Sequence, residues 1–271
     1  MDVGAILKKT ELLLKPTSTS VRLDSELLLS HLLQKDRSWV HTHPEHILQR
    51  SDLCKLDEMV ERRVSGESIA YILGYKEFYG RNFIVNSDVL VPRPESESFI
   101  EMLGDLAKVR PPQGIHNVLD MGTGSGCLAV TTKLEYPHLN VFASDISKAA
   151  LQVAIKNSQE YKVPITFKIQ SLLNNDKQGY DVIIANLPYV PESMKDKSIM
   201  SEPPEALFSG SDGLKHYTRL FEQLEPKHIR YVLLESLLLQ HDSISKLAIE
   251  SGYKLTRTDG LVQLFTKVDA P

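Results

Sequence analysis

The sequence predicts an α/β protein in which a small helical domain precedes a mostly parallel sheet that ends in an antiparallel hairpin. Downstream of Pro94, apolar strand-like runs alternate with helical patterns, and such alternation implies a parallel sheet with helices on both faces. The last two runs, 253–258 and 261–268, are separated by Asp259-Gly260, a hairpin signal. A chain of 271 residues can bury a large core and form two domains.

Composition excludes several classes of protein. A net charge of -4 argues against nucleic-acid binding through bulk electrostatics. No apolar run is long enough to cross a bilayer, and the N-terminal residues resemble neither a secretory signal nor an Arg-rich presequence. Cys54 and Cys127 give neither a disulfide framework nor the ligand spacing of a metal site. We therefore expect a cytoplasmic protein without a metal or a membrane segment. We also expect a monomer, because no exposed apolar stripe stands out.

Residues 1–74 are predicted to form the helical domain. Apolar residues recur there at helical spacing with charged residues between them, and Gly74 is expected to end the last helix. The recurring apolar residues are Leu23, Leu27, Leu28, Leu32 and Leu33 after the break at Pro16, then Leu53, Leu56, Met59, Val60 and Val64.

Residues 75–92 are predicted to be a β-hairpin linker. The runs 78–85 and 89–91 have the composition of strands and lead to Pro92. The α/β domain then occupies residues 93–271. Pro94, with Glu95 and Glu97 after it, favours a helix start at this point.

The parallel sheet is predicted from short apolar runs with helices between most of them. Ligands of such sheets bind beyond the carboxyl ends of the strands. The candidate strands are 118–120, 141–144, 165–169, 182–185 and 231–234, and the candidate helices include 148–161, 214–224 and 240–251.

A glycine-rich loop follows the first of these strands. Its Gly-x-Gly-x-Gly spacing differs from the Gly-x-Gly-x-x-Gly of dinucleotide folds, in which a helix start meets a pyrophosphate. Glycine lets the backbone approach a ligand without a phosphate closely, such as the amino-acid tail and ribose of S-adenosylmethionine. The alternative is a tight strand-to-helix turn that binds nothing. The candidate cofactor residues here are Asp120, Gly122, Thr123, Gly124, Ser125 and Gly126.

Asp145 ends the next strand and strengthens the prediction of a cofactor site. A carboxylate at this position can accept hydrogen bonds from both ribose hydroxyls. Asp145 could instead cap the helix that begins near Lys148, but Ser147 is better placed to do so. We therefore predict that Asp145 binds the methyl donor.

The turn Asn186-Leu187-Pro188-Tyr189 directly follows the apolar strand 182–185. The Asn186 carboxamide oxygen and a turn carbonyl can accept both N–H bonds of a planar NH2 group and aim its lone pair at a methyl carbon. Pro188 stiffens the turn, and Tyr189 can pack on the planar group. Proximity and orientation of this kind lower a barrier by about 7–11 kcal/mol in favourable cases. The alternative is a plain Asn/Pro turn beside a core tyrosine. We predict that all four residues bind the acceptor, with Asn186, Pro188 and Tyr189 catalytic and Asn186 also near the cofactor.

With these motifs the chain resembles the HemK family, the protein-(glutamine N5) methyltransferases that act on peptide chain release factors. The resemblance covers nearly the whole chain. Residues 70–74, 78–80 and 89–97 resemble the linker signature of the family, and residues 202–207 and 210–214 resemble the loop that follows the acceptor turn.

The resemblance implies a fold, a cofactor and a substrate. The fold is the Rossmann-like, seven-stranded sheet of class I methyltransferases, and the cofactor is S-adenosylmethionine. The helical domain would dock the release factor, and the acceptor would be the glutamine of its Gly-Gly-Gln tripeptide. The resemblance also suggests that Arg93 and Glu95 help to close the donor pocket. Main-chain carbonyls of Leu187 and Pro188 would assist Asn186.

The chain departs from the family pattern at four places, one of which is an Arg-containing closing motif that is not evident near Asp259-Gly260. Leu187 stands where the family has proline, and Asn-Leu-Pro-Tyr is more typical of ribosomal RNA adenine dimethyltransferases. The segment 170–173 replaces a Gly-Asp-Leu near the adenine, which leaves Leu172 as the predicted contact there. Glu235-Ser236 replaces a Glu-Ile-Gly.

Two rival functions follow from the same residues. One is an RNA or DNA amino-group (adenine N6) methyltransferase that uses the same turn. The other is a binding module that keeps the cofactor fold without turnover, which the retained acids and acceptor turn disfavour. Cys127 could be read as a nucleophile, but methyl transfer needs no covalent intermediate, and a small residue packed at a helix start explains it better.

Overall fold

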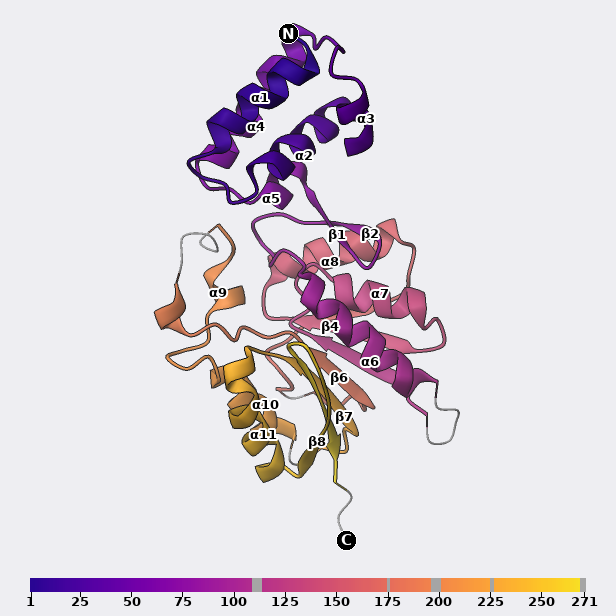
Figure 1. Cartoon of the computed structure of the whole chain (residues 1–271). Coiled ribbons are helices and arrows are strands. Elements are labelled where there is room, and N and C mark those ends of the chain that lie inside the picture. The colour runs from indigo at the N-terminus through magenta and orange to yellow at the C-terminus, as the bar shows by residue number, and fades with distance from the viewer. Residues whose placement is uncertain (109–113, 175, 196–200, 225–226, 269–271) are drawn as a thin grey trace. The chain divides into compact units, whose positions relative to one another are not determined.

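The chain folds as two units, whose helices and strands are labelled in Figure 1. The computed structural model describes residues 1–108, 114–174, 176–195, 201–224 and 227–268. Of the described residues, one unit comprises 1–75 with Ser201, and the other comprises those within 76–195 and 202–268. Within the described part of the chain, no helix has both the length and the apolar character that crossing a bilayer requires.

The first unit is a bundle of helices around its own apolar core. Asp2 and Asp36 cap two of the helices, because their side chains accept hydrogen bonds from the amides of Ala5 and Trp39. Gly74, at φ 79°, ends the last helix, as predicted. The helices are α1 (Val3–Leu14), α2 (Val21–Leu33), α3 (Arg37–Thr42), α4 (Arg50–Val64) and α5 (Ile69–Leu73). The core includes Val3, Ile6, Leu14, Leu28, Leu29, Val40, Leu56, Val60 and Ile72.

The β-hairpin lies earlier in the chain than the sequence suggested. Its strands are β1 (Tyr75–Phe78) and β2 (Arg81–Ile84), and residues 89–91 form no strand. Tyr79 and Gly80 both have positive φ, 52° and 71°, as the two-residue turn of a hairpin requires. The predicted strand over 78–85 was therefore wrong, because a tyrosine in the left-handed region broke what looked like one continuous run.

The second unit is built on a seven-stranded sheet in the order β5-β4-β3-β6-β7-β9-β8. The strands β5, β4, β3, β6 and β7 are parallel, and β9 runs antiparallel to both β7 and β8. This arrangement confirms the predicted fold class. The strands are β3 (Asn117–Met121), β4 (Asn140–Asp145), β5 (Thr166–Ile169), β6 (Val182–Ala185), β7 (Tyr231–Glu235), β8 (Tyr253–Asp259) and β9 (Val262–Lys267).

The central strands are apolar on both faces, as expected for a sheet that helices cover on each side. Along β6, Val182 and Ile184 contribute to one core cluster, while Ile183 and Ala185 contribute to another. Helices α6, α7 and α8 cover one face, and α10 and α11 cover the other (Figure 1). These helices are α6 (Ser98–Ala107), α7 (Cys127–Glu135), α8 (Lys148–Glu160), α10 (Lys215–Leu224) and α11 (His241–Glu250).

Short helical turns complete the second unit around the carboxyl edge of the sheet. Pro94 occupies the first position of one such turn, which leads into α6, so the predicted helix start is confirmed. The turns are η1 (Pro94–Glu97), η2 (Glu192–Met194), α9 (Pro204–Leu207) and η3 (Leu238–Gln240).

Candidate active site

The glycine loop between β3 and α7 is held by main-chain contacts from two sides. The amides of Gly122 and Thr123 both donate to the Ser144 carbonyl, at 2.8 and 2.9 Å. Gly126 has φ 79°, and a Cβ there would lie 2.9 Å from the Cβ of Ala154. Only glycine therefore lets the loop lie directly on α8.

A buried asparagine on α8 ties this loop to the hairpin. The Asn157 Nδ2 donates to the carbonyls of Ser125 and Ile84, at 2.8 and 3.0 Å, and its Oδ1 accepts from the Ile84 amide at 2.8 Å. Since the side chain is fully buried, loss of these bonds would leave unpaired polar groups. Asn157 was not singled out from the sequence, because its partners lie far from it in the chain.

Asp120 lies beneath the glycine loop with one carboxylate oxygen engaged. Its Oδ2 accepts from the Thr123 hydroxyl at 2.6 Å and from the Ala129 amide at 3.1 Å. Its Oδ1 is buried and has no partner among the described residues. Burial raises the pKa of Asp120 to about 7, although the two hydrogen bonds oppose this shift. An unpaired buried oxygen at a glycine loop fits a ligand that brings a positive charge or a hydrogen-bond donor.

Asp145 is arranged to bind a pair of hydroxyls. Its Oδ1 accepts from the Ser147 amide at 2.8 Å, and its Oδ2 accepts from the Gly124 amide at 3.0 Å. A carboxylate has about four acceptor sites, so acceptor capacity remains for a ligand. The Ser147 hydroxyl accepts from the Ala150 amide at 3.2 Å and caps α8, as predicted. Burial raises the pKa of Asp145 above its ordinary value.

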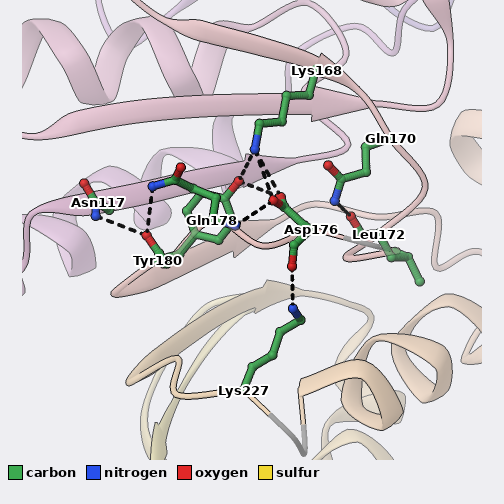
Figure 2. Close-up of polar contacts among 9 residues, drawn as sticks. Asn117, Lys168, Gln170, Leu172, Asp176, Gln178, Tyr180 and Lys227 are labelled. Carbon is green, nitrogen blue, oxygen red and sulfur yellow. Dashed lines mark hydrogen bonds and ion pairs between the residues drawn. The ribbon is translucent and has the colours of Figure 1, made fainter.

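The loop after β5 presents Leu172 in the left-handed region, at φ 51°. Figure 2 shows the Gln170 side chain bent back so that its Nε2 donates to the Leu172 carbonyl, at 2.8 Å. The next amide, that of Leu173, donates to Gln223 Oε1 on α10 at 2.8 Å. These bonds hold the loop in place from both ends.

A polar cluster centred on Asp176 anchors the far side of that loop (Figure 2). The Tyr180 hydroxyl donates to Asp176 Oδ2 at 2.7 Å, and Lys168 Nζ lies 3.1 Å from Asp176 Oδ1. The ammonium of Lys227 donates to the Asp176 main-chain carbonyl at 2.8 Å. Burial alone would raise the pKa of Asp176, but the hydrogen bonds from Tyr180, the Gln178 amide and Lys168 outweigh burial and lower it to about 2.

The acceptor turn is anchored by groups that sequence analysis did not single out. The Asn186 Nδ2 donates to Ser96 Oγ at 2.9 Å. Ser96 Oγ donates in turn to Glu235 Oε2 at 2.6 Å, and the Tyr189 hydroxyl donates to Glu235 Oε1 at 2.9 Å. Burial raises the pKa of Glu235, although its three hydrogen-bonded neighbours oppose this. From the sequence, the only indication of this hydrogen-bonded group was that Glu235-Ser236 departs from the family pattern.

The turn carbonyls differ in how far they are already engaged. The Tyr189 carbonyl accepts from Gln240 Nε2 at 2.8 Å. The Leu187 carbonyl lies 3.3 Å from the buried Tyr217 hydroxyl, whose single hydrogen goes to the nearer Glu235 carbonyl. The Pro188 carbonyl accepts none of the hydrogen bonds that the described residues make. Of the two carbonyls proposed to assist Asn186, that of Pro188 is therefore the more available.

Leu187 contributes packing rather than a polar contact. Its side chain is buried, and a Cβ on Gly122 would lie 3.0 Å from its Cδ2. The leucine at this position therefore packs against the glycine loop and leaves the polar groups of the turn in place.

These segments enclose one cavity, of about 210 Å³, at the carboxyl edge of the sheet. Among the predicted site residues, those that line it are Gly122, Thr123, Gly124, Ser125, Asp145, Leu172, Asn186, Leu187 and Pro188. Asp120, Gly126 and Tyr189 do not line it. The stacking of Tyr189 on the acceptor stays a prediction.

The cavity is also lined by residues that were not predicted from the sequence to line it, or were suggested only by the family resemblance. Arg93 lines it and is held by Glu202, whose Oε1 lies 2.5 Å from Arg93 Nη2. His216 and Arg219 reach it from one face of α10, where their spacing of three residues is a signal that could have been used. Ile146, next to Asp145, is a further lining residue. Cys127 also lines the cavity, but burial raises the pKa of its thiol to about 12, so it is no nucleophile.

The strand order, with a reversed strand beside β7, is that of the class I methyltransferases, and solved structures agree. A methyltransferase from Pyrococcus furiosus matches with a TM-score of 0.53 at 18% identity, over 78% of this chain and 99% of the other. The catalytic domain of hMettl16, solved with an RNA hairpin, matches with a TM-score of 0.55 at 12% identity, over 82% and 83% of the two chains. Identities this low establish the fold alone.

Sequence comparison gives the family. A model described as the PrmC N-terminal domain matches residues 5–74, and one described as the methyltransferase small domain matches residues 104–209. Release factor glutamine methyltransferases from Koribacter versatilis and Coxiella burnetii are 41% and 37% identical, over 76% and 89% of this chain and 74% and 88% of their own lengths. A bifunctional methyltransferase from Rickettsia prowazekii is 33% identical over 86% of this chain, which spans 50% of that protein. The chain belongs to the release factor glutamine methyltransferase family.

Proposed function

We propose that this protein transfers a methyl group from S-adenosylmethionine to the side-chain amide nitrogen of the glutamine in the Gly-Gly-Gln motif of peptide chain release factors. The observation that carries the proposal is the anchoring of Asn186 at the cavity. Its Nδ2 is bound to Ser96, so its Oδ1 is left to accept a hydrogen bond from an NH2 group. Family membership supports a release factor as the source of that NH2 group.

The residues around the cavity fit S-adenosylmethionine. The carboxylate of Asp145 has acceptor sites free for the ribose hydroxyls, and Leu172 and Ile146 offer apolar surface to an adenine. The glycine loop suits the amino-acid tail, because a Cβ on Gly124 would meet open space, and Asp120 lies beneath this loop with Oδ1 unpaired. When bound, the cofactor supplies an electrophilic methyl carbon attached to a sulfonium.

The task of this chain is then to position the acceptor nitrogen. A carboxamide nitrogen is a weak nucleophile because its lone pair is delocalised. Asn186 Oδ1 and the Pro188 carbonyl can accept its two N–H bonds, fix its plane and increase the electron density on nitrogen. The nitrogen becomes acidic as it acquires the methyl group, so water can take the departing proton. Catalysis here is proximity and orientation.

The test is mass spectrometry of a release factor incubated with the enzyme and the cofactor. We expect one added methyl group on the Gly-Gly-Gln glutamine. Asn186→Ala should abolish most of this methylation, by about 100-fold, while calorimetry shows cofactor affinity within a few-fold of wild type. Normal turnover by this variant would remove Asn186 from the reaction.

The substrate class is tested with isotope-labelled cofactor and separate pools of release factor and RNA. Label in the release factor supports the proposal. Label confined to RNA would instead assign the protein to the amino-group methyltransferases of nucleic acids.

A further inference from the structure

We propose that Ser96 and Glu235 are positioning residues that fix which end of the Asn186 carboxamide faces the acceptor. The inference rests on the function proposed above and deepens it. Nothing in the acceptor turn itself determines this orientation, because the oxygen and nitrogen of a carboxamide have nearly the same shape.

The three residues converge from separate parts of the second unit. Ala185 pairs with Leu234 in the parallel register of β6 and β7, so Asn186, which follows β6, comes next to Glu235, the last residue of β7. Ser96 comes from η1, ahead of α6. Ser96 and Glu235 are 3% and 1% exposed, respectively, so water cannot replace the hydrogen bonds between them.

The direction of each hydrogen bond follows from the chemistry of Glu235. An ionised carboxylate only accepts hydrogen bonds, so the single Ser96 hydroxyl hydrogen goes to Glu235 Oε2, at 2.6 Å. Ser96 Oγ then has only lone pairs left for Asn186, at 2.9 Å. The atom facing Ser96 must therefore be Asn186 Nδ2. The carboxylate thus sets the orientation of the asparagine through the Ser96 hydroxyl and through its own hydrogen bond with the Asn186 side chain.

The orientation matters because the acceptor also carries an NH2 group. With Nδ2 held by Ser96, Oδ1 makes no hydrogen bond among the described residues and is free to accept one from the acceptor. A reversed carboxamide would present N–H to N–H, which is repulsive. Such a reversal would lower kcat while leaving Asp145 and the glycine loop, the main predicted cofactor residues, in place.

Tyr189 also holds the Glu235 carboxylate in place. Its hydroxyl donates to Glu235 Oε1 at 2.9 Å. Burial and the neighbouring Glu235 raise the pKa of Tyr189 well above its ordinary value. The phenol therefore stays protonated and donates to Glu235, so it does not serve as a base.

The kinetic test uses Ser96→Ala, Glu235→Gln and the double variant, with wild type, on a release factor. Ser96→Ala removes the lone pairs that hold Nδ2, and Glu235→Gln lets the chain of hydrogen bonds run in either direction. We expect each single change to lower kcat by about 10- to 100-fold. Cofactor Kd should stay within about threefold. Because both residues act through Asn186, the double variant should be about as slow as the slower single variant.

Ser236→Ala is the matched control. Ser236 is as buried as Glu235, and its hydroxyl has no partner among the described residues, so kcat should not change. Unchanged kcat in Ser96→Ala would overturn the proposal. Multiplicative losses in the double variant, or equal losses in cofactor affinity and kcat, would also overturn it, because they indicate independent or purely structural effects.

A second measurement needs no acceptor and so separates this inference from the proposed function. The side-chain NH2 signals of Asn186 are identified in ¹H–¹⁵N spectra by their loss in Asn186→Ala. We expect them to shift in Ser96→Ala and Glu235→Gln but not in Ser236→Ala. Signals that do not move in either of the first two variants would sink the inference, even if wild type methylates a release factor. If wild type methylates none, the proposed function fails while these spectra still decide the orientation of Asn186.

Discussion

The Asp120 carboxylate is fully buried, and only one of its two oxygens accepts hydrogen bonds from the described residues. Its ionisation should therefore lower the stability of the folded protein by a measurable amount. Its pKa is raised from 3.8 to about 7 in the folded protein, chiefly by burial. An acid whose pKa is raised by folding stabilises the protein fully below its unfolded pKa, and this contribution is lost as the pH rises through the folded pKa. The cofactor-free protein should thus lose stability between about pH 4 and 7 on account of this one residue.

Asp120→Asn tests this pH-dependent loss of stability. The Asn oxygen can keep the hydrogen bonds from Thr123 and Ala129, and the side chain does not titrate. We expect the free energy of unfolding of the variant, relative to wild type, to increase from pH 4 to 8 by a few kcal/mol, on the order of 1.4 kcal/mol per pH unit at most. Urea denaturation at several pH values without cofactor measures it. Parallel pH profiles for the two proteins would show that Asp120 does not titrate in this range.

At the scale of residues, the sequence predicts the groups that follow strands and misses those that meet through the fold. Asp120, Asp145 and Asn186 each stand at the end of an apolar run, so their shared edge could be deduced from parallel pairing. Ser96 and Glu235 are 139 residues apart, and their contact depends on how η1 packs over the end of β7. Periodicity and local motifs carry no information about such a contact.

At the scale of elements, the strands and helices of the α/β unit follow the apolar pattern closely. The predicted run 182–185 coincides with β6, and the predicted helix 148–161 differs from α8 by one residue. The predicted hairpin was misplaced because its turn depends on Tyr79 in the left-handed conformation. A tyrosine in a sequence does not indicate this conformation. Turns whose geometry is imposed by packing are therefore the least predictable elements here.

The loop before α10 and the side chain of Gln240 both contact the acceptor turn, and this contact can be tested. Gln240 Nε2 donates to the carbonyls of Tyr189 and Asp212, both at 2.8 Å. Gly213, at φ 79°, lies so close that a Cβ would overlap the Tyr189 carbonyl oxygen and Gln240 Nε2. Gly213→Ala should therefore push the turn away from its support, lower stability by about 2–4 kcal/mol and reduce kcat.

Gly210→Ala is the control for this change. Gly210 has a similar φ of 75°, but its Cβ would meet only the Cβ of Lys215, at 3.8 Å. It should cost about 1 kcal/mol through backbone strain alone and leave kcat near wild type. Thermal unfolding and methylation rates measure both effects. If the two variants behave alike, backbone strain rather than contact with Tyr189 is responsible.

At the scale of the whole molecule, the two units have separate cores and distinct expected tasks. The apolar core of the first unit is formed from helices α1 to α5 and the residues between them. All residues that line the cavity lie between Asp88 and Arg219, in the second unit. From the sequence alone, a change of period near Gly74 leads us to expect a helical domain before the α/β domain. We propose that the first unit docks the release factor, whereas the second carries cofactor binding and methyl transfer.

Removal of residues 1–75 separates docking from chemistry. Cofactor Kd should stay within a few-fold, because no lining residue is lost. The kcat/KM for an intact release factor should fall by about tenfold or more, equivalent to about 1.4 kcal/mol of lost docking energy. A short peptide that carries Gly-Gly-Gln is the control acceptor, and its slower methylation should be the same with and without the first unit, because it is too small to use a docking surface. If the truncated chain binds cofactor normally but loses activity equally toward peptide and intact factor, the first unit acts on the catalytic site instead of docking the substrate.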